Sequence, residues 1–577
     1  MLPSIERESI GGVPVLRAAS PSGTNTAALT FRVGRFDEAL PTSGITHLVE
    51  HLALASTPPQ RYQFNAEVSG LFTTFVMQGT DNLDVARFLA AVCQGLTAHH
   101  EGRLEQEKRV LRTEALHREG ASMIATCLRE RYGATGPGLL GYEEFGLHRL
   151  GWAEINAWRS SWFTAANAVL CIVGELPAGL EIDLPAGQPR AAPSLTPLAL
   201  DLPGFVVAGM GGVGMSMTLP SMPSGRVTLD ILERRLTRIL RYDRGLTYRV
   251  GCIREALTVG LDHAWVAADA LPEHIPMVAE TVLATLDTIS DTGPTDEELQ
   301  DYEHRLRDSL QSADDGAAQV VTRAAQRVLT HQPDQDSEQL LAEVTGVEPS
   351  DVRQTAADLL STAIVAIPRP VPALAGRMKQ LPKWSAATIT GTEFAARSGA
   401  KLTVGEAGVM LRVQPGDRVS IPAGEAAGLL RWNDGKRALI GKDGFVVGFD
   451  PAHWNDADLV RRSLESLIDP SAVIDIDEPG PATIGHLTGP IALASQPAPL
   501  ARDALSPSPG TMVVPVRVSR TLSRRSHVIR ALWLAVTAGG VLAISNKDWG
   551  GLVFVVLGLS GVALQQVLAI RRQRRAR

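Results

Sequence analysis

Apolar residues in the first third of the chain follow two patterns, which together predict a mixed α/β domain. Continuous apolar runs of strand length occur at 27–34 (AALTFRVG) and at 168–176 (AVLCIVGEL). Between them, apolar residues return every three to four positions over 85–100 and 104–119. That spacing predicts helices with one buried face. We therefore expect these strands and helices to form one domain over residues 1–190.

The same order of elements is repeated after a Pro/Ala-rich stretch at 185–203. Residues 204–368 begin with a strand-like run, continue with a helix at 225–241 and strands around 246–270, and end with helices and the strand-like TAIVAIP. Two similar halves in tandem predict an internal duplication, with a second α/β domain over 200–368.

The pattern changes after residue 368, where residues 369–395 are expected to form a linker. Over 400–450, short alternating runs are broken by the turn sequences PGD, NDGK and KDG, which predicts antiparallel strands. An amphipathic helix follows at 455–468, with Asn455 as its expected N-cap. This layout predicts a small β-rich module over 396–470 that resembles a pleckstrin-homology-like barrel. The chain as a whole is therefore expected to be α+β.

The C-terminal part combines a Pro/Ala/Ser-rich stretch, expected to be a flexible tether over 478–525, with two apolar runs at 528–545 and 549–570. The second run is long enough to cross about 30 Å of hydrocarbon. Arginines flank the pair on both outer sides: Arg520, Arg524, Arg525, Arg571, Arg572, Arg574, Arg575 and Arg577. Because positive flanks stay in the cytoplasm, the pattern predicts two transmembrane helices over 528–570 in the cell membrane, with cytoplasmic soluble domains. The alternative is a buried helical hairpin of a soluble domain.

Composition narrows the class of protein. The chain has 577 residues, 45% apolar and 20% charged, which is typical of a globular protein of three or four domains. Its four cysteines are far apart, which argues against a disulfide scaffold and against a cysteine-ligated metal. Residues 517–577 hold 11 Lys/Arg and one acid, whereas the rest holds 44 Lys/Arg and 61 Asp/Glu. An acidic body with a basic tail excludes a nucleic-acid binder and favours a membrane.

The candidate chemistry lies in the sequence HLVEH at 47–51. On a helix, His47 and His51 share one face, so both imidazoles can reach one metal ion. Glu50 lies beside them, and a carboxylate that is not used as a ligand can act as a base. The alternative is a pair of surface histidines on an ordinary helix.

The surrounding sequence GRFDEALPTSGITHLVEHLAL (34–54) resembles the pitrilysin/insulinase family of inverted zinc peptidases, whose signature is HxxEH. The resemblance implies that His47 and His51 bind Zn²⁺ and that Glu50 is the general base. It also implies a third ligand on a later helix, the second of two glutamates seven residues apart. In EKRVLRTE (107–114), Glu107 is then the supporting acid and Glu114 the ligand.

One feature departs from the family pattern. Glu114 follows His51 by 63 residues, a shorter gap than the family leads us to expect. Glu105, Glu119 and Glu130 therefore compete with Glu114 for the role of ligand.

Two further segments extend the resemblance. FNAEVSGLFTTF (64–75) has the Asn-Ala start of the family's edge strand, so Asn65 and Ala66 are expected to bind substrate backbone by strand addition. LRYDRGLTYRV (240–250) resembles the family's RxxxGLxY element, which implies that Arg241 and Tyr248 bind the substrate carbonyl and the developing oxyanion.

The resemblance implies a membrane-anchored zinc metalloendopeptidase that cuts peptides or unfolded segments. Family members enclose substrate between two halves, so a half-sized chain is expected to pair with a second copy or with a related chain. Two other interpretations stay open. In the first, the chain is a catalytically silent partner of another zinc-bearing chain. In the second, it is a membrane adaptor that uses the peptidase fold as a scaffold.

Overall fold

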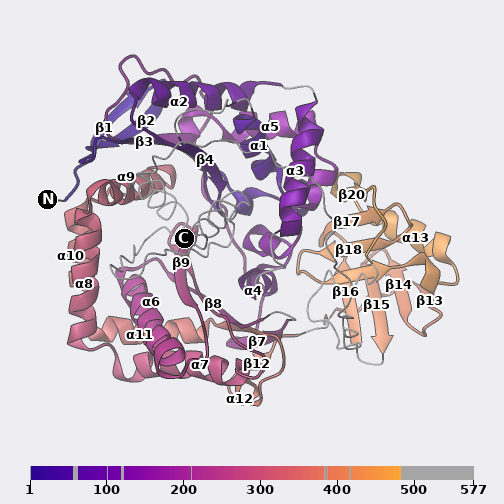
Figure 1. Cartoon of the computed structure of the whole chain (residues 1–577). Coiled ribbons are helices and arrows are strands. Elements are labelled where there is room, and N and C mark those ends of the chain that lie inside the picture. Colours follow the sequence, from indigo (N-terminus) through magenta and orange to yellow (C-terminus); the bar gives the residue numbers. More distant parts are fainter. Residues whose placement is uncertain are drawn as a thin grey trace, which may run out of the picture.

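The computed structural model describes residues 2–481 apart from 56, 58–62, 100–101, 118–122, 209–210, 383–384, 386 and 415–416. Figure 1 shows an N-terminal and a second α/β domain, with an orange β-rich module beside the helices of the first. The expected tether begins within this range and continues beyond it, and the expected hairpin at 528–570 lies outside it. Among the described residues, no helix has both the length and the apolar character that a membrane span needs.

The first domain is a six-stranded sheet with helices packed on it. In spatial order its strands are β1 (Glu6–Ile10), β2 (Val13–Ala18), β6 (Ala168–Val173), β3 (Asn25–Phe31), β5 (Thr73–Gly79) and β4 (Gln63–Val68). Its helices are α1 (Ile45–Leu54), α2 (Asn82–Thr97), α3 (Arg103–His117), α4 (Met123–Tyr132) and α5 (Trp152–Trp162). Helix α4 packs on the sheet of the second domain. Alternate residues of β3 and β5, such as Leu29 and Phe75, join α1 and α2 in one apolar core.

The second domain repeats this architecture. Its sheet has the spatial order β12 (Lys379–Gln380), β7 (Gly204–Val207), β11 (Ile364–Ile367), β8 (Val213–Pro220), β10 (Leu261–Ala268) and β9 (Val250–Thr258). Its helices are α6 (Pro223–Leu236), α7 (Ile275–Thr292), α8 (Asp296–Gln311), α9 (Ala313–Leu329), α10 (Ser337–Thr345) and α11 (Pro349–Ser361). In each sheet a parallel pair, β2 with β6 or β7 with β11, is followed by three antiparallel strands. The edge strands differ, since β1 is antiparallel to β2 and β12 is parallel to β7. Apart from these edge strands, the two sheets share one strand order.

The stretch 369–395 is not simply a linker. It contains α12 (Pro372–Ala375) and β12, which pairs with β7 and extends the second sheet by one strand. Only its end belongs to the module, which begins at β13 (Thr392–Ala395). The linker prediction was therefore wrong for residues 372–380, because strand pairing with a distant segment leaves no periodic signal in so short a run.

The β-rich module has two four-stranded sheets. The outer sheet contains β13, β14 (Lys401–Gly405), β15 (Gly408–Gln414) and β16 (Asp417–Pro422), and the inner sheet contains β19 (Val446–Phe449), β18 (Arg437–Gly441), β17 (Ala426–Trp432) and β20 (Val473–Ile476). Helix α13 (Ala457–Glu465) starts after Asp456 rather than Asn455. The chain then adds β20, parallel to β17. The module thus continues past residue 470 and does not end on its helix, as a pleckstrin-homology-like barrel was expected to do.

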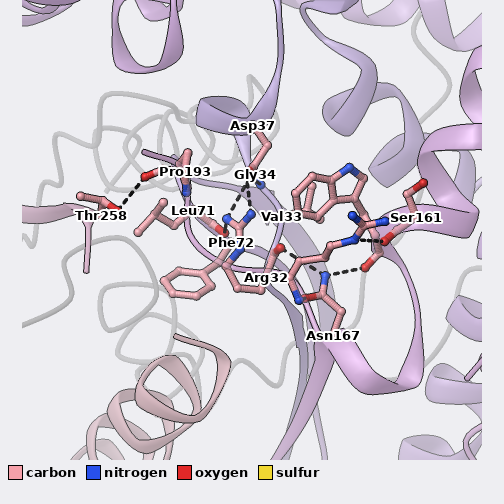
Figure 2. A network of polar contacts seen from close by, with 12 residues as sticks. Arg32, Val33, Gly34, Asp37, Leu71, Phe72, Ser161, Asn167, Pro193 and Thr258 are labelled. Atoms are coloured by element: carbon pink, nitrogen blue, oxygen red, sulfur yellow. Dashed lines mark hydrogen bonds and ion pairs between the residues drawn. The ribbon is translucent and has the colours of Figure 1, made fainter. Parts of the chain in front are cut away.

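A buried ion pair fixes the turn that leads into α1. Arg32, which is fully buried, donates to both carboxylate oxygens of Asp37 and to the carbonyl oxygen of Leu71, and the N–H of Gly34 donates to Asp37 (Figure 2). The amide of Asn167 donates to the Arg32 carbonyl at 3.2 Å. These bonds join the start of the turn to the residues just before β5 and β6, so the entry to α1 has a defined position.

Candidate metal centre

Helix α1 carries the HLVEH sequence, and its start is held by a buried carboxylate. Glu38 accepts hydrogen bonds from the N–H groups of Gly44 (2.8 Å) and Thr46 (2.9 Å), two of the free donors at a helix start. Gly44 has φ +86°, a conformation that suits glycine. Burial raises the pKa of Glu38 to about 7, against the lowering effect of these bonds. The apolar face of α1 is buried in the core, which directs the HxxEH residues toward α3.

The two histidines lie together at the surface of this core. Their ring centroids are 5.0 Å apart and the rings are nearly perpendicular, at 88°. Nε2 of His47 lies 3.7 Å from Glu50 and 3.8 Å from Glu114, and Nε2 of His51 lies 3.8 Å and 3.7 Å from the same carboxylates. The structure therefore brings all four residues together around one point.

These separations fit a zinc ion. Ligand atoms at 2.0–2.1 Å from a tetrahedral ion lie about 3.3 Å from one another. The Nε2 to carboxylate distances exceed this by only a few tenths of an ångström, and they are too long for direct hydrogen bonds. Two imidazoles and one carboxylate form a donor set that zinc accepts in catalytic sites, with a fourth position left for substrate or water. His47, His51 and Glu114 are thus suited to hold the metal.

Helix α3 supplies the acidic residues opposite α1. Glu107 and Glu114 are seven residues apart, about two helical turns, and both point at the histidines. Glu105 pairs instead with Lys108 at 2.7 Å, and Glu130 bonds to Arg129. Glu119 lies outside the described residues. Among the described candidates, Glu114 alone approaches both Nε2 atoms.

Both histidines also have a carboxylate on their other ring nitrogen. Nδ1 of His51 lies 3.3 Å from Glu107, and Nδ1 of His47 lies 3.2 Å from Glu144, whose carboxylate is also 3.4 Å from Arg35. Such partners fix the imidazole tautomer, so that Nε2 presents its lone pair to the metal. Glu107 was expected from its position on the later helix, whereas Glu144 was not expected. Its only trace in the sequence is the YEEFG stretch, which lacks the helical spacing that marked the other acids.

The site has a negative field. Burial by itself would lower the pKa of His51, but the Glu107 hydrogen bond and the charges of Glu50 and Glu114 outweigh burial and raise it. A field that favours a proton on imidazole also favours a divalent cation between the two rings.

Strand β4 forms the free edge of the sheet next to α1. Ala66 points into the core and Asn65 is half-buried on the opposite face. On that second face Glu67 carries a buried carboxylate oxygen, Oε2, without a hydrogen-bond partner among the described residues. Burial raises the pKa of Glu67 to about 8, with Arg35 opposing the shift and Glu50 adding to it. No strand in the described part of the chain pairs with the outer edge of β4, which is the edge that strand addition would use.

The second element implied by the family resemblance lies in the second domain. Arg241 belongs to a π-helical segment (Thr237–Asp243) that continues α6, and π-helical turns are frequent at functional sites. Its guanidinium lies 5.3 Å from the ring of Tyr248 and 5.5 Å from the ring of Tyr242, and these tyrosines are 66% and 70% exposed. The structure thus joins Arg241 to Tyr248. No contact among the described residues joins either of them to His47 or Glu50 of the same chain.

A second polar cluster links a serine, a histidine and a glutamate in the order of a hydrolase triad. Unlike a hydrolase triad, it is closed to substrate. Nε2 of His263 lies 2.8 Å from Oγ of Ser216, and Nδ1 lies 3.0 Å from Glu255. Ser216 and His263 are both fully buried, between the second sheet and α4 of the first domain. Because a substrate cannot reach the hydroxyl, this cluster satisfies buried polar atoms at the domain interface.

Comparison with known proteins identifies the fold. No family model matches this sequence, and no curated protein matches it. Among solved structures, a protease from Helicobacter pylori covers 64% of this chain and all of its own, at a TM-score of 0.54 and 17% identity. The peptidase M16 inactive domain from Pseudomonas fluorescens covers 64% and 99%, at 0.52 and 14%. The first half of the periplasmic protease PqqL from Escherichia coli covers 65% and 93%, at 0.50 and 15%.

These likenesses confirm the pitrilysin-like M16 peptidase fold that the sequence motifs implied. The fold by itself does not decide activity, because one of the similar structures is an inactive domain. Activity therefore depends on the residues of the site.

Proposed function

Because the chain has the fold of the M16 peptidases, we propose that it is a zinc metalloendopeptidase whose metal is held by His47, His51 and Glu114. The observation that carries the proposal is the meeting of both Nε2 atoms with Glu114 and Glu50 at 3.7–3.8 Å. When bound, zinc supplies a Lewis acid that polarises a carbonyl and makes water more acidic.

In this proposal Glu50 is the residue that moves the proton. It is buried beside both histidines and is not needed as a ligand once Glu114 fills that place. Its carboxylate accepts a proton from the attacking water and donates it to the leaving amine of the cut peptide bond. Glu107 and Glu144 hold the two imidazoles in the tautomer that leaves Nε2 free of a proton.

The substrate binds as an added strand on β4. The edge N–H and C=O groups of β4 pair with the main chain of any extended peptide, so binding depends little on side chains. Asn65 and Ala66 lie on this strand, next to α1. We therefore expect short or unfolded peptides to be cut in preference to folded proteins.

Arg241 and Tyr248 complete the site from a second subunit. Both are exposed and stacked on one another, which suits a pair that binds a peptide carbonyl and stabilises the oxyanion. We propose that the second subunit is another copy of this chain or a related chain.

The location at a membrane is a separate part of the proposal and rests on the sequence. The two apolar runs of 528–570 lie between arginine clusters, and this pattern supports a two-helix anchor with the peptidase on the cytoplasmic side. Fractionation of cells expressing the full chain, followed by a carbonate wash, tests this part. Release of the protein by the wash would contradict it.

The central experiment separates metal binding from catalysis. Purified full-length protein should contain about one zinc per chain and should cut members of a peptide library, as read by mass spectrometry. Glu50→Gln should keep the zinc and lose the cleavage. Glu105→Gln, which changes an exposed acid of α3, is the matched control and should behave as wild type. Zinc bound by wild type without any cleavage would favour the silent-partner interpretation.

A further inference from the structure

The inner sheet of the β-rich module is apolar on both faces. In β17, the neighbours Leu429 and Leu430 are both fully buried, and in β18 the same holds for Leu439 and Ile440. Because successive residues of a strand point to opposite faces, each pair places one side chain on each side of the sheet. A strand that buries adjacent apolar side chains on opposite faces belongs to a sheet covered on both sides.

The two faces contact different parts of the protein. Leu429 and Leu439 pack inside the module, against its outer sheet and α13. Leu430 and Ile440 pack instead in a separate apolar cluster shared with the first peptidase domain. We call this cluster the buttress; its members are Leu40, Ala134, Leu139, Phe145, Leu430, Trp432, Ala438, Ile440, Val446, Ile474 and Ile476. The peptidase domain is therefore the cover of the inner sheet.

Polar contacts fix the position of the module on this domain. The N–H of Ala134 donates to the carbonyl oxygen of Lys442 at 3.0 Å. Next to it, Gly133 lies so close to Lys442 that a Cβ atom there would be 1.9 Å from the same oxygen. Glu478 forms an ion pair with Arg112 on α3, the helix that carries Glu114. The module is thus held against the first domain by main-chain contact at residues 133–134 and by an ion pair to α3.

Two of the residues on the peptidase side of the buttress, Leu40 and Phe145, adjoin segments that position the metal site. Leu40 lies in the turn between Glu38 and α1, and Glu38 binds the first N–H groups of that helix. Phe145 directly follows Glu144, whose carboxylate lies 3.2 Å from Nδ1 of His47. The inner sheet thus packs against the turn before α1 and against the residue that follows Glu144.

We propose that the β-rich module positions the metal site, with Leu430 and its neighbours in the buttress acting on His47 through Phe145 and Glu144. This inference rests on the proposed function, because it assigns the module a role in metal binding. Leu430 and Phe145 are positioning residues, since neither touches the metal ligands. The module is in this view a third part of the peptidase and not a separately docked domain.

The experiment compares two adjacent leucines of one strand in the full-length protein. Leu430→Ala opens a cavity in the buttress, whereas Leu429→Ala opens a cavity of similar size inside the module. Zinc affinity is measured by competition with a chromogenic chelator, and the visible spectrum of the cobalt-substituted protein reports ligand geometry. We expect Leu430→Ala to weaken zinc binding about tenfold or more, as loss of an outer partner does, and to change the cobalt spectrum. Leu429→Ala should keep both, and Leu430→Met should restore both.

A milder pair of variants keeps the test decisive if Leu430→Ala does not fold. Ile474→Val in the buttress and Ile468→Val inside the module each remove one methyl group. Only the first should weaken zinc binding. Equal zinc affinity in wild type and the buttress variants, or equal weakening by both members of a pair, would overturn this inference alone. Absence of zinc from the wild-type protein would overturn the proposed function and this inference with it.

Discussion

The carboxylate of Glu144 lies 3.2 Å from Nδ1 of His47, although 97 residues separate the two in the chain. Glu107 stands in the same relation to His51, at 3.3 Å. Each candidate ligand on α1 is therefore oriented by an acid from a different segment, one on α3 and one at the start of a 3-10 turn. Such pairs control how strongly an imidazole binds a metal, because they fix its tautomer and raise its basicity.

The first prediction concerns this pair. Glu144→Gln keeps the shape of the side chain but removes the charge that orients His47, so zinc affinity should fall about 10- to 100-fold. Chelator competition measures it. Glu143→Gln changes the exposed neighbouring acid and should leave zinc affinity unchanged. If the two variants behaved alike, Glu144 would have no role in holding the metal.

The second prediction concerns the third ligand. Glu114→Gln should reduce zinc affinity by more than Glu144→Gln does, because it removes a ligand and not a partner of one. Glu130→Gln should have no effect, since Glu130 bonds to Arg129 and not to the histidines. Zinc content after dialysis measures both. Loss of zinc from Glu130→Gln with retention by Glu114→Gln would contradict the assignment.

The residues of the metal site that could be found in the sequence are those with helical spacing. Glu50 and His51 lie three and four residues after His47, and Glu114 lies seven residues after Glu107. Each of these spacings places the later residue on the same helix face as the earlier one. Glu144 has no such signature, because its contact with His47 depends on how two distant segments pack.

The fold, like the metal site, was predictable where local spacing marks a helix or a strand. Local periodicity gave the two α/β domains, but β12 and β20 are short strands that exist only through parallel pairing with β7 and β17. The alternating runs expected over 400–450 predicted strands with one apolar face, whereas Leu429–Leu430 and Leu439–Ile440 bury apolar side chains on both faces. Nothing in the sequence showed that the first peptidase domain covers one face of that sheet.

The third prediction concerns the turn before α1. Asp37→Asn leaves the guanidinium of Arg32 buried without its counter-charge, and breaking a buried ion pair from one side costs about 3–5 kcal/mol of folding free energy. The urea midpoint should fall accordingly. Glu393→Gln breaks the exposed pair with Lys401 and should cost less than about 1 kcal/mol. Equal shifts for both variants would show that the Arg32 pair is not the source of the stability.

The fourth prediction is a pH dependence in the second domain. Burial raises the pKa of Glu233 from 4.5 to about 7, against a hydrogen bond from the N–H of Cys252, with the charge of Asp230 adding to the shift. A raised pKa in the folded state gives stability that is complete below about 4.5 and is lost as pH rises through about 7.

The amide side chain that Glu233→Gln introduces does not titrate. The melting temperature of Glu233→Gln should therefore rise relative to that of wild type between pH 4.5 and about 7, and the difference should stay constant at higher pH. At about 1.4 kcal/mol per pKa unit, the free energy of unfolding of wild type falls by roughly 3 kcal/mol relative to that of Glu233→Gln over this range. Melting curves of both proteins from pH 4.5 to 9 measure it. A difference that does not change with pH would contradict a raised pKa.

The last prediction tests whether the site is shared between subunits. Within one chain, Arg241 and Tyr248 have no contact with the zinc-ligand candidates among the described residues, yet the proposed mechanism needs them at the same peptide bond. If two copies assemble so that each site takes α1 from one chain and Arg241 from the other, Glu50→Gln and Arg241→Ala chains should each be nearly inactive alone. Co-expressed, they should regain up to about a quarter of wild-type activity, because half of randomly formed dimers are mixed and each mixed dimer has one intact site.

The control for this experiment is co-expression of Glu50→Gln with Glu114→Gln. Both changes fall on the α1 and α3 side of the site, so no mixed dimer contains an intact one and activity should stay low. Differently tagged chains purified in two steps show that mixed dimers form. Mixed dimers without recovered activity would mean that the site lies within one chain or that Arg241 acts on a different partner. The second case would be recognised by a wild-type homodimer that binds zinc and cuts no peptide until a related chain is added.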